Sequence, residues 1–148
     1  MKLTSSGTVF FQPTGSFLDY VQREFSTRPL IDVGAGIGLL TKVLRDKGMK
    51  CLPIDIYERD ETIVDVAPLD ATEMEFPSDC VPIIARPCHG YFVAPTVRNA
   101  LTRVPFVLYV GLAKNFELDL DGLDFCKLEI CLFNAGEDGE IVVKISKR

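Results

Sequence analysis

The sequence predicts an α/β fold, in which a doubly wound and mostly parallel sheet has helices on both faces, giving three layers. Short apolar segments typical of buried strands alternate with segments of helical periodicity over the first two thirds of the chain. A glycine-rich turn joins the first strand to a helix, as expected of a parallel unit. Two strand-like segments then flank residues 136–139 and predict a C-terminal antiparallel hairpin in the same sheet.

The first elements have clear start and stop signals. Phe17, Val21 and Phe25 recur at helical spacing after a capping segment, and they predict a helix over residues 16–26. The apolar run 30–33 predicts a buried strand that leads into the glycine turn. A helix is expected from residue 39 to Gly48, which suits the position after a helix end. Residues 51–56 predict a second strand, although it contains a proline.

The later elements are predicted from weaker patterns. Strands are expected at 63–66, 81–85 and 106–110, and hairpin strands at 127–133 and 140–147. A helix with Pro95 in its first turn is expected to continue through Leu101, and a polar loop is expected over 113–124. Residues 57–61 are too few to form a crossover between parallel strands, which normally takes about a dozen residues. The missing helix should leave apolar surface on the sheet, and we therefore expect a homodimer that covers it.

Length and composition exclude several classes of protein. The chain has 148 residues, which fits a single domain over residues 1–148. Its 47% hydrophobic and 25% charged residues are ordinary for a globular protein and exclude disorder and collagen. No apolar run exceeds five residues, against about 20 for a membrane-spanning helix, and no secretory signal is evident at the N-terminus. We therefore expect a cytoplasmic protein without membrane contact.

Charge and cysteine content bear on partners and metals. Sixteen Lys and Arg against twenty-one Asp and Glu give a net charge of −5, which disfavours a nucleic-acid partner. The five cysteines are scattered without a CxxC pair, so we predict reduced thiols, no disulfide framework and no metal site.

The glycine turn carries most of the functional information. Glycines at 34, 36 and 38 allow a sharp turn out of the strand and a close approach of a ligand to the backbone. Asp55 follows twenty-one residues after Gly34, the distance at which a carboxylate meets ribose hydroxyls in nucleotide sites. The spacing is G-x-G-x-G rather than the G-x-G-x-x-G of dinucleotide sites, and the lysine of a P-loop is absent. Asp32 beside the turn would repel a phosphate and attract a cationic amine.

In these motifs the sequence resembles the class I S-adenosylmethionine-dependent methyltransferases, which have a Rossmann-like fold, over most of the chain. The resemblance implies that residues 32–38 lie under the methionine part of the cofactor, that Asp55 binds the ribose, and that Ile56, Asp70 and Ala71 lie at the adenine. The cofactor-binding residues expected in full are Asp32, Gly34, Ala35, Gly36, Gly38, Asp55, Ile56, Asp70, Ala71 and Arg86. Structural roles remain open for the acids: a turn cap for Asp32, a solvated strand end for Asp55, and a turn or helix cap for Asp70.

Candidate catalytic residues lie at the end of the fourth predicted strand, where the resemblance implies the acceptor side. Methyl transfer from a sulfonium needs alignment, and a base only if the acceptor must lose a proton. His89 could accept that proton or be a loop histidine without a catalytic role. Pro87-Cys88 resembles the Pro-Cys motif of enzymes that methylate cytosine at carbon 5, where a thiolate attacks the ring. The other motifs of those enzymes are absent after the fifth strand, and Cys88 could be merely a small residue near the pocket.

Three functions are therefore weighed. The first is an S-adenosylmethionine-dependent methyltransferase with an unidentified acceptor. The second is a non-catalytic S-adenosylmethionine-binding module or partner subunit, favoured by the missing helices and by the absence of the Asp/Asn-Pro-Pro-Tyr/Phe motif. The third is a nicotinamide-dependent reductase, which the glycine spacing disfavours.

Overall fold

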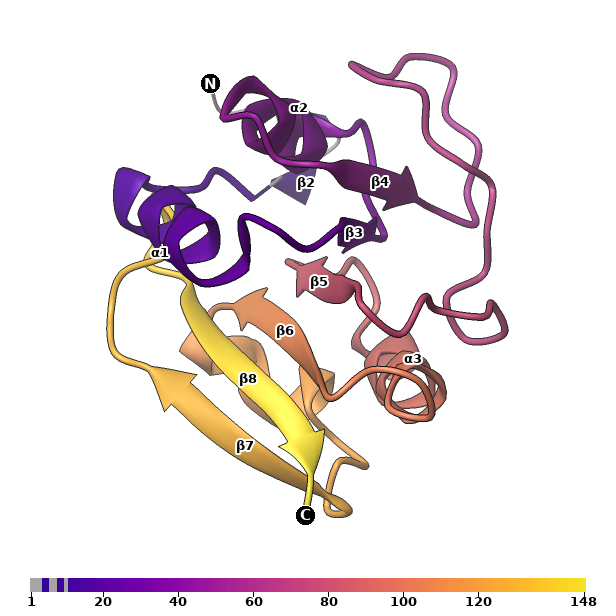
Figure 1. The fold of residues 1–148 in the computed structure, drawn as a ribbon, viewed down its shortest axis with the longest axis vertical. Coiled ribbons are helices and arrows are strands. Elements are labelled where there is room, and N and C mark those ends of the chain that lie inside the picture. Colours follow the sequence, from indigo (N-terminus) through magenta and orange to yellow (C-terminus); the bar gives the residue numbers. More distant parts are fainter. Residues whose placement is uncertain (1–3, 6–7, 10) are drawn as a thin grey trace.

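A six-stranded sheet in the order β4-β3-β5-β6-β8-β7 forms the centre of the molecule (Figure 1). The computed structural model describes residues 4–5, 8–9 and 11–148. The strands of this sheet are β3 (Leu30–Val33), β4 (Cys51–Ile54), β5 (Val81–Ala85), β6 (Phe106–Gly111), β7 (Cys126–Cys131) and β8 (Ile141–Lys147). The first four are parallel, whereas β8 runs antiparallel to both β6 and β7. The predicted parallel sheet with a closing hairpin is confirmed. A separate antiparallel pair is formed by β1 (Thr4–Ser5) and β2 (Thr8–Val9).

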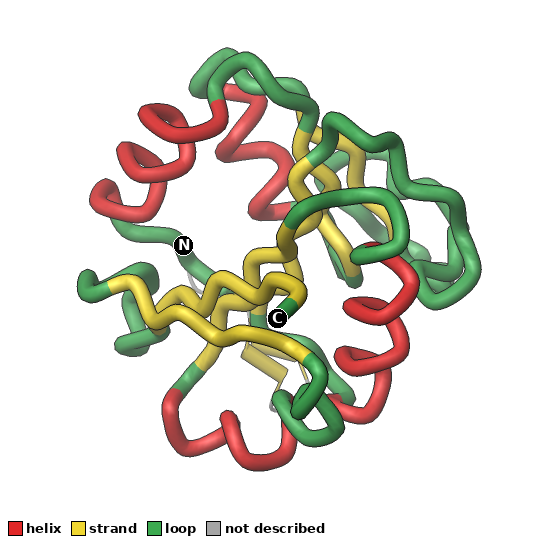
Figure 2. The backbone as a smooth tube through the Cα atoms, turned by 60° about the horizontal axis from the view of Figure 1, so that its bottom comes forward, coloured by secondary structure: helices red, strands yellow, loops and turns green. Residues whose placement is uncertain are grey.

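Helices cover both faces of the sheet, so the predicted three-layer arrangement is confirmed (Figure 2). The helices are α1 (Gly15–Phe25), α2 (Leu39–Asp46), α3 (Val93–Ala100) and α4 (Phe116–Asp119), with short 3₁₀ turns at Gly90–Phe92 and Ala113–Asn115. On one face, Phe17 of α1 and Leu44 of α2 pack in a core with Leu108 of β6. On the other face, Val97 of α3 packs in a second core with Val107. Each side of the sheet therefore has its own buried apolar core.

Local chemistry explains where the first helices begin and end. The hydroxyl of Thr14 accepts a hydrogen bond from the Phe17 amide at 3.2 Å and caps α1. Gly48 has a φ of +84° and donates its amide to the carbonyl of Arg45, which closes α2. These are the boundaries expected from the capping residues and from the glycine.

Two sequence predictions are wrong. Residues 63–66 form no strand; Ala67 alone makes an isolated parallel bridge to Ile54, because the short connection cannot bring a full strand back in parallel. Residues 113–124 are not a simple loop, since a 3₁₀ turn and α4 form there and Phe116 packs against the core. The predicted helix with Pro95 in its first turn is confirmed, since α3 begins at Val93 and ends at Ala100.

The two outer strands of the sheet end differently. Beside β4, the Asp55 and Ala67 amides donate to the carbonyls of Ala67 and Pro53, so the connection after β4 follows this edge. Beside β7 no further strand is paired in the described part of the chain, and apolar side chains remain exposed on it, at Leu128 and Ile130. The expected homodimer stays a prediction. None of the helices in the described residues is long and apolar enough to span a membrane.

Candidate functional site

Three cavities meet beyond the carboxyl ends of the parallel strands. A small cavity of about 40 Å³ lies over the glycine turn, and a larger one of about 340 Å³ lies beside the ends of β3 and β4. An open groove of about 580 Å³ runs past residues 86–89. Arg59 and Cys88 line all three cavities. Because the chain crosses from β3 to β4 on one side and β5 pairs on the other, this is the place where open α/β sheets bind ligands.

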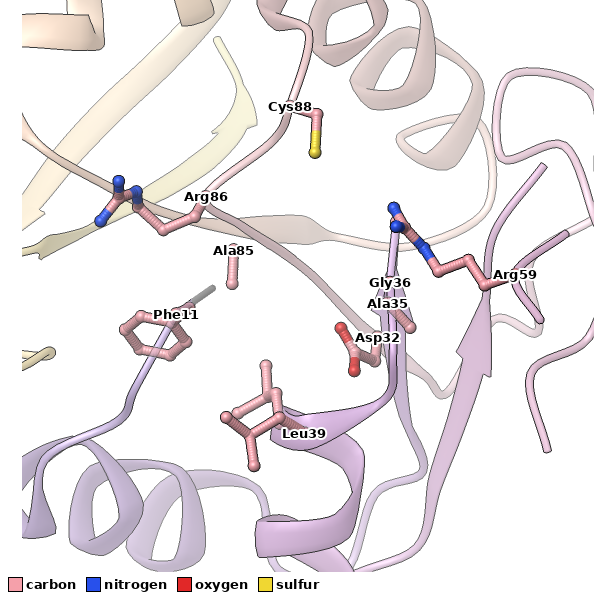
Figure 3. A pocket seen from close by; sticks show the side chains of 11 residues that line it. Phe11, Asp32, Ala35, Gly36, Leu39, Arg59, Ala85, Arg86 and Cys88 are labelled. Carbon is pink, nitrogen blue, oxygen red and sulfur yellow. The ribbon is translucent and has the colours of Figure 1, made fainter. Parts of the chain in front are cut away.

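Asp32 places a buried carboxylate in the wall of the small cavity (Figure 3). Its Oδ2 accepts a hydrogen bond from the Thr41 hydroxyl of α2 at 2.8 Å. Burial raises the pKa of Asp32 to about 6; the bonds from Thr41 oppose this rise, and the nearby charge of Asp55 adds to it. A carboxylate held out of water in this way is stabilised by a cation, so the small cavity suits an ammonium group.

Asp55 connects the glycine turn to the loop after β4. Its Oδ2 accepts the amide of Gly36 at 2.9 Å, and its Oδ1 accepts the amide of Tyr57 at 2.9 Å. The side chain is buried and lines the larger cavity. Because each carboxylate oxygen can accept a second hydrogen bond, Asp55 keeps the capacity to bind hydroxyl groups.

The glycine turn requires its glycines for two reasons. Gly34, Gly36 and Gly38 have φ values of +68°, +61° and +88°, which side chains rarely adopt. A Cβ at Gly38 would also lie 2.4 Å from Cγ2 of Val64. The amide of Ala35 donates to the carbonyl of Ile54 at 2.9 Å, which fixes the turn against β4. Backbone atoms of Gly34 to Gly36 therefore line the small cavity without covering side chains.

The far wall of the larger cavity contains the other predicted residues. Ile56 is 55% exposed, and Ala71 is buried in the wall. Asp70 lines the cavity and also caps its own turn, since its Oδ1 accepts the amide and the hydroxyl of Thr72 at 2.9 and 2.7 Å. Thr96 of α3, which sequence reasoning missed, lies in the same wall and has a buried hydroxyl without a hydrogen-bond partner.

Arg86 has a left-handed backbone conformation, and its side chain is already paired with an acid. Its φ is +47°, and its Nη1 donates to the fully buried carboxylate of Glu140 at 3.0 Å. Figure 3 shows its guanidinium pointing away from Asp32 and Arg59. Arg86 lines the small cavity, but its charged end connects β5 to the loop before β8. Glu140 was not singled out in the sequence, although an acid between Gly139 and a buried strand was a usable signal.

Cys88 and His89 are exposed beside two tyrosines that sequence reasoning also missed. The His89 ring stacks on Tyr91, with centroids 5.3 Å apart and planes 27° apart. Tyr57 lies edge-on to His89 at 6.5 Å, and its hydrogen bond with Tyr91 raises the pKa of Tyr57. The structure therefore brings the two candidate catalytic residues to the rim where the cavities join.

No metal-binding cluster forms in residues 4–5, 8–9 and 11–148, as no three His, Cys, Asp or Glu side chains gather suitably. All five cysteines are free of disulfides. The groups that line the three cavities include carboxylates, backbone amides, aromatic rings and the exposed thiol of Cys88.

Comparison with known proteins shows the fold. No protein-family model and no curated protein matches the sequence. The 23S rRNA methyltransferase ErmE aligns with 94% of this chain and 70% of its own, at a TM-score of 0.59 and 14% identity. Magnesium protoporphyrin IX methyltransferase from Synechocystis PCC 6803, solved with bound SAM, aligns over 90% and 77%, at 0.60 and 11%. A dimethyladenosine transferase from Plasmodium falciparum aligns over 94% and 63%, at 0.58 and 17%. The chain thus shares the Rossmann-like α/β fold of these methyltransferases, as expected from its sequence.

Proposed function

We propose that this chain is an S-adenosylmethionine-dependent methyltransferase that binds its cofactor across the small and the larger cavity. The observation that carries the proposal is the double use of Asp55. Its carboxylate holds the Gly36 amide of the glycine turn and also lines the larger cavity. A buried acid in this position serves both to shape the turn and to accept sugar hydroxyls.

The residues present fit the cofactor in each of its parts. Asp32 offers a buried negative charge to the ammonium group of the methionine end. Asp55 offers acceptor capacity to the ribose, and Ile56 and Ala71 offer apolar surface to the adenine. Fold likeness to methyltransferases, one of them solved with SAM, supports the same assignment.

The chemistry needs little beyond placement. When bound, S-adenosylmethionine would supply an electrophilic methyl group on a sulfonium. The glycine turn and Asp55 orient the ligand through fixed backbone and carboxylate groups, and alignment of this kind can supply much of the rate acceleration. His89 can hold a proton taken from an acceptor in the groove, because it lines both the groove and the larger cavity.

Two other functions remain to be tested. The absence of a helix from residue 55 to residue 80 favours the alternative of a non-catalytic S-adenosylmethionine-binding module or partner subunit. Exposure of the Cys88 thiol at the junction of the cavities favours a second alternative, an enzyme that methylates cytosine at carbon 5 through a covalent bond to this thiol. A covalent adduct with a fluorocytosine-containing oligonucleotide, detected by intact mass, would support cytosine methylation through Cys88. If no adduct forms with either DNA or RNA, this alternative is excluded.

Calorimetry tests cofactor binding directly. S-adenosylhomocysteine should bind the wild-type protein, and NAD should not. Asp55→Ala should weaken that binding by about tenfold to a hundredfold, because charge-assisted hydrogen bonds are lost. Asp121→Ala, which removes an exposed acid outside the cavities, is the matched control and should bind as the wild type does.

Two results would contradict the proposal: no binding of S-adenosylhomocysteine by the wild type, or equal binding by Asp55→Ala. Transfer of a labelled methyl group from the cofactor to acceptors of several classes then separates an enzyme from a binding module. Nucleic acids belong in that set, since an rRNA methyltransferase shares the fold.

A further inference from the structure

Aromatic rings are exposed to solvent beyond the end of β5, where the groove joins the larger cavity. Tyr57 is 52% exposed and Tyr91 is 74% exposed, and both flank the ring of His89. Three exposed rings close together are unusual on a surface, because aromatic side chains gain most from being buried. An exposed cluster of this kind is typical of a site that binds another flat, apolar group.

The rings are held in place from two different loops. Tyr57 follows β4, whereas His89 and Tyr91 lie between β5 and α3. The rings of Tyr57 and His89 meet edge-on with centroids 6.5 Å apart, which brings the two loops together. Stacking of His89 on Tyr91 fixes the ring plane at the mouth of the groove. The aromatic surface is therefore present before a ligand binds.

The groove has the size and the composition of a site for a small ring system. Its volume of about 580 Å³ lies within the range of ligand sites, about 300–1,000 Å³. Tyr57 and His89 line it together with Cys88, and the same three residues line the larger cavity. A ring lying on His89 would therefore have its edge at the point where the cavities join.

We infer that a planar aromatic ring binds where the groove joins the larger cavity, stacked on the surface formed by Tyr57 and His89, which line both, and by Tyr91, which lines the larger cavity. Calling that ring the methyl acceptor rests on the proposed function; the binding itself does not. The ring could belong to a free small aromatic compound or to an unpaired base of a nucleic acid, because both offer the same flat face.

One signal reports on this site directly, because His89 is the sole histidine of the chain. Its imidazole protons give a single set of resonances in a proton–carbon NMR spectrum. With the protein saturated with S-adenosylhomocysteine, addition of 2-naphthol should shift these resonances upfield through the ring current of the stacked probe. Decahydro-2-naphthol, which has the same hydroxyl but no flat ring, should leave them unchanged.

Variants locate the binding surface. Tyr91→Leu should weaken 2-naphthol binding by about fivefold or more, and Tyr91→Phe, which keeps the ring, should stay near the wild-type affinity. Leu118→Ala is the control for an exposed apolar side chain elsewhere, since Leu118 is 76% exposed and lines none of the three cavities. Equal binding by Tyr91→Leu and the wild type would overturn the inference, as would equal shifts from both naphthols or no shift at all.

A second arm separates the two sources of the ring. A single-stranded oligonucleotide that shifts the His89 signal more than an abasic strand of equal length would assign the ring to a nucleic acid. A shift with 2-naphthol alone would assign it to a free compound. If S-adenosylhomocysteine fails to bind, the proposed function fails, and the same titration in its absence still tests the groove.

Discussion

The ends of β3 and β4 hold their chemical groups in a different way from the end of β5. At β3 and β4, the carboxylates of Asp32 and Asp55 are buried and fixed by hydrogen bonds from Thr41 and from backbone amides. Beyond β5, Cys88 and His89 are exposed, and the His89 ring stacks on Tyr91. The first region holds its polar groups in fixed positions out of water, whereas the second leaves its groups open to solvent.

The residues after β5 also differ among themselves in how they are held. The Arg86 side chain is held by its hydrogen bond to the buried Glu140, whereas Cys88 and His89, which follow it, are exposed. The comparison therefore predicts that mutations of anchoring groups change stability, and that mutations of the exposed groups change binding alone.

The largest effect on stability is expected when Glu140, the buried ion-pair partner of Arg86, is replaced. Glu140→Ala should lower the free energy of unfolding by about 3–5 kcal/mol, because it leaves the largely buried Arg86 guanidinium with only the longer ion pair to the partly exposed Asp138, at 3.5 Å. Glu140→Gln keeps an acceptor of the same shape and should cost less. Urea unfolding measures both, and a loss below about 1 kcal/mol for Glu140→Ala would show that the pair is not an anchor.

The next effect tests the glycine turn of the β3 region. Gly38→Ala combines a left-handed backbone with a Cβ close to Val64, whereas Gly48→Ala has a similar φ and open space around the Cβ. Gly48→Ala should cost about 1–2 kcal/mol from backbone strain alone, and Gly38→Ala about 1–3 kcal/mol more. Adding Val64→Ala to Gly38→Ala should recover only the extra loss of stability caused by the contact with Val64, and not the loss from backbone strain. Equal losses for the two alanine variants would refute the steric part of this explanation.

Asp32→Asn should stabilise the protein at neutral pH. The pKa of Asp32 rises from 3.8 to about 6 on folding, so the native state binds the proton more tightly than the unfolded state. Stability from this group is complete below pH 4 and is lost as the pH rises through 6. The gain from Asp32→Asn should therefore grow between pH 4 and pH 6 and reach about 1–3 kcal/mol at pH 7.

Thermal unfolding across this pH range measures the gain, with Asp121→Asn as an exposed control that should show none. A gain that is largest in acid would have the wrong sign for this account. The same variant should bind S-adenosylhomocysteine more weakly, since the negative charge in the small cavity is removed.

The smallest effect is expected from the exposed residues of the β5 region. Cys88→Ser and His89→Ala should each change the free energy of unfolding by less than about 0.5 kcal/mol, because neither side chain is buried. Chemical unfolding of the two variants checks this. A loss above about 1.5 kcal/mol would mean that these side chains support the fold and would remove the contrast between the two regions.

The same contrast explains what the sequence could and could not predict. Glycines at positive φ and acids at strand ends leave a pattern, because backbone geometry allows few alternatives, and β3, β5 and the glycine turn were predicted with the observed bounds. The strand at 63–66 and the loop at 113–124 were wrong, because connection length and distant packing decide those segments. Arg59 comes to the site only through the tertiary fold, so no local pattern marked it, whereas Glu140 lay beside a glycine and a buried strand and Tyr91 lay two residues from His89.

A crystal structure with S-adenosylhomocysteine is the most direct test. The account predicts that the purine occupies the space between Ile56 and Ala71, with the sugar oxygens within hydrogen-bonding range of Asp55 and the amino group near Asp32. Crystals grown at saturating ligand that show this space empty, or the compound bound elsewhere on the protein, would contradict it.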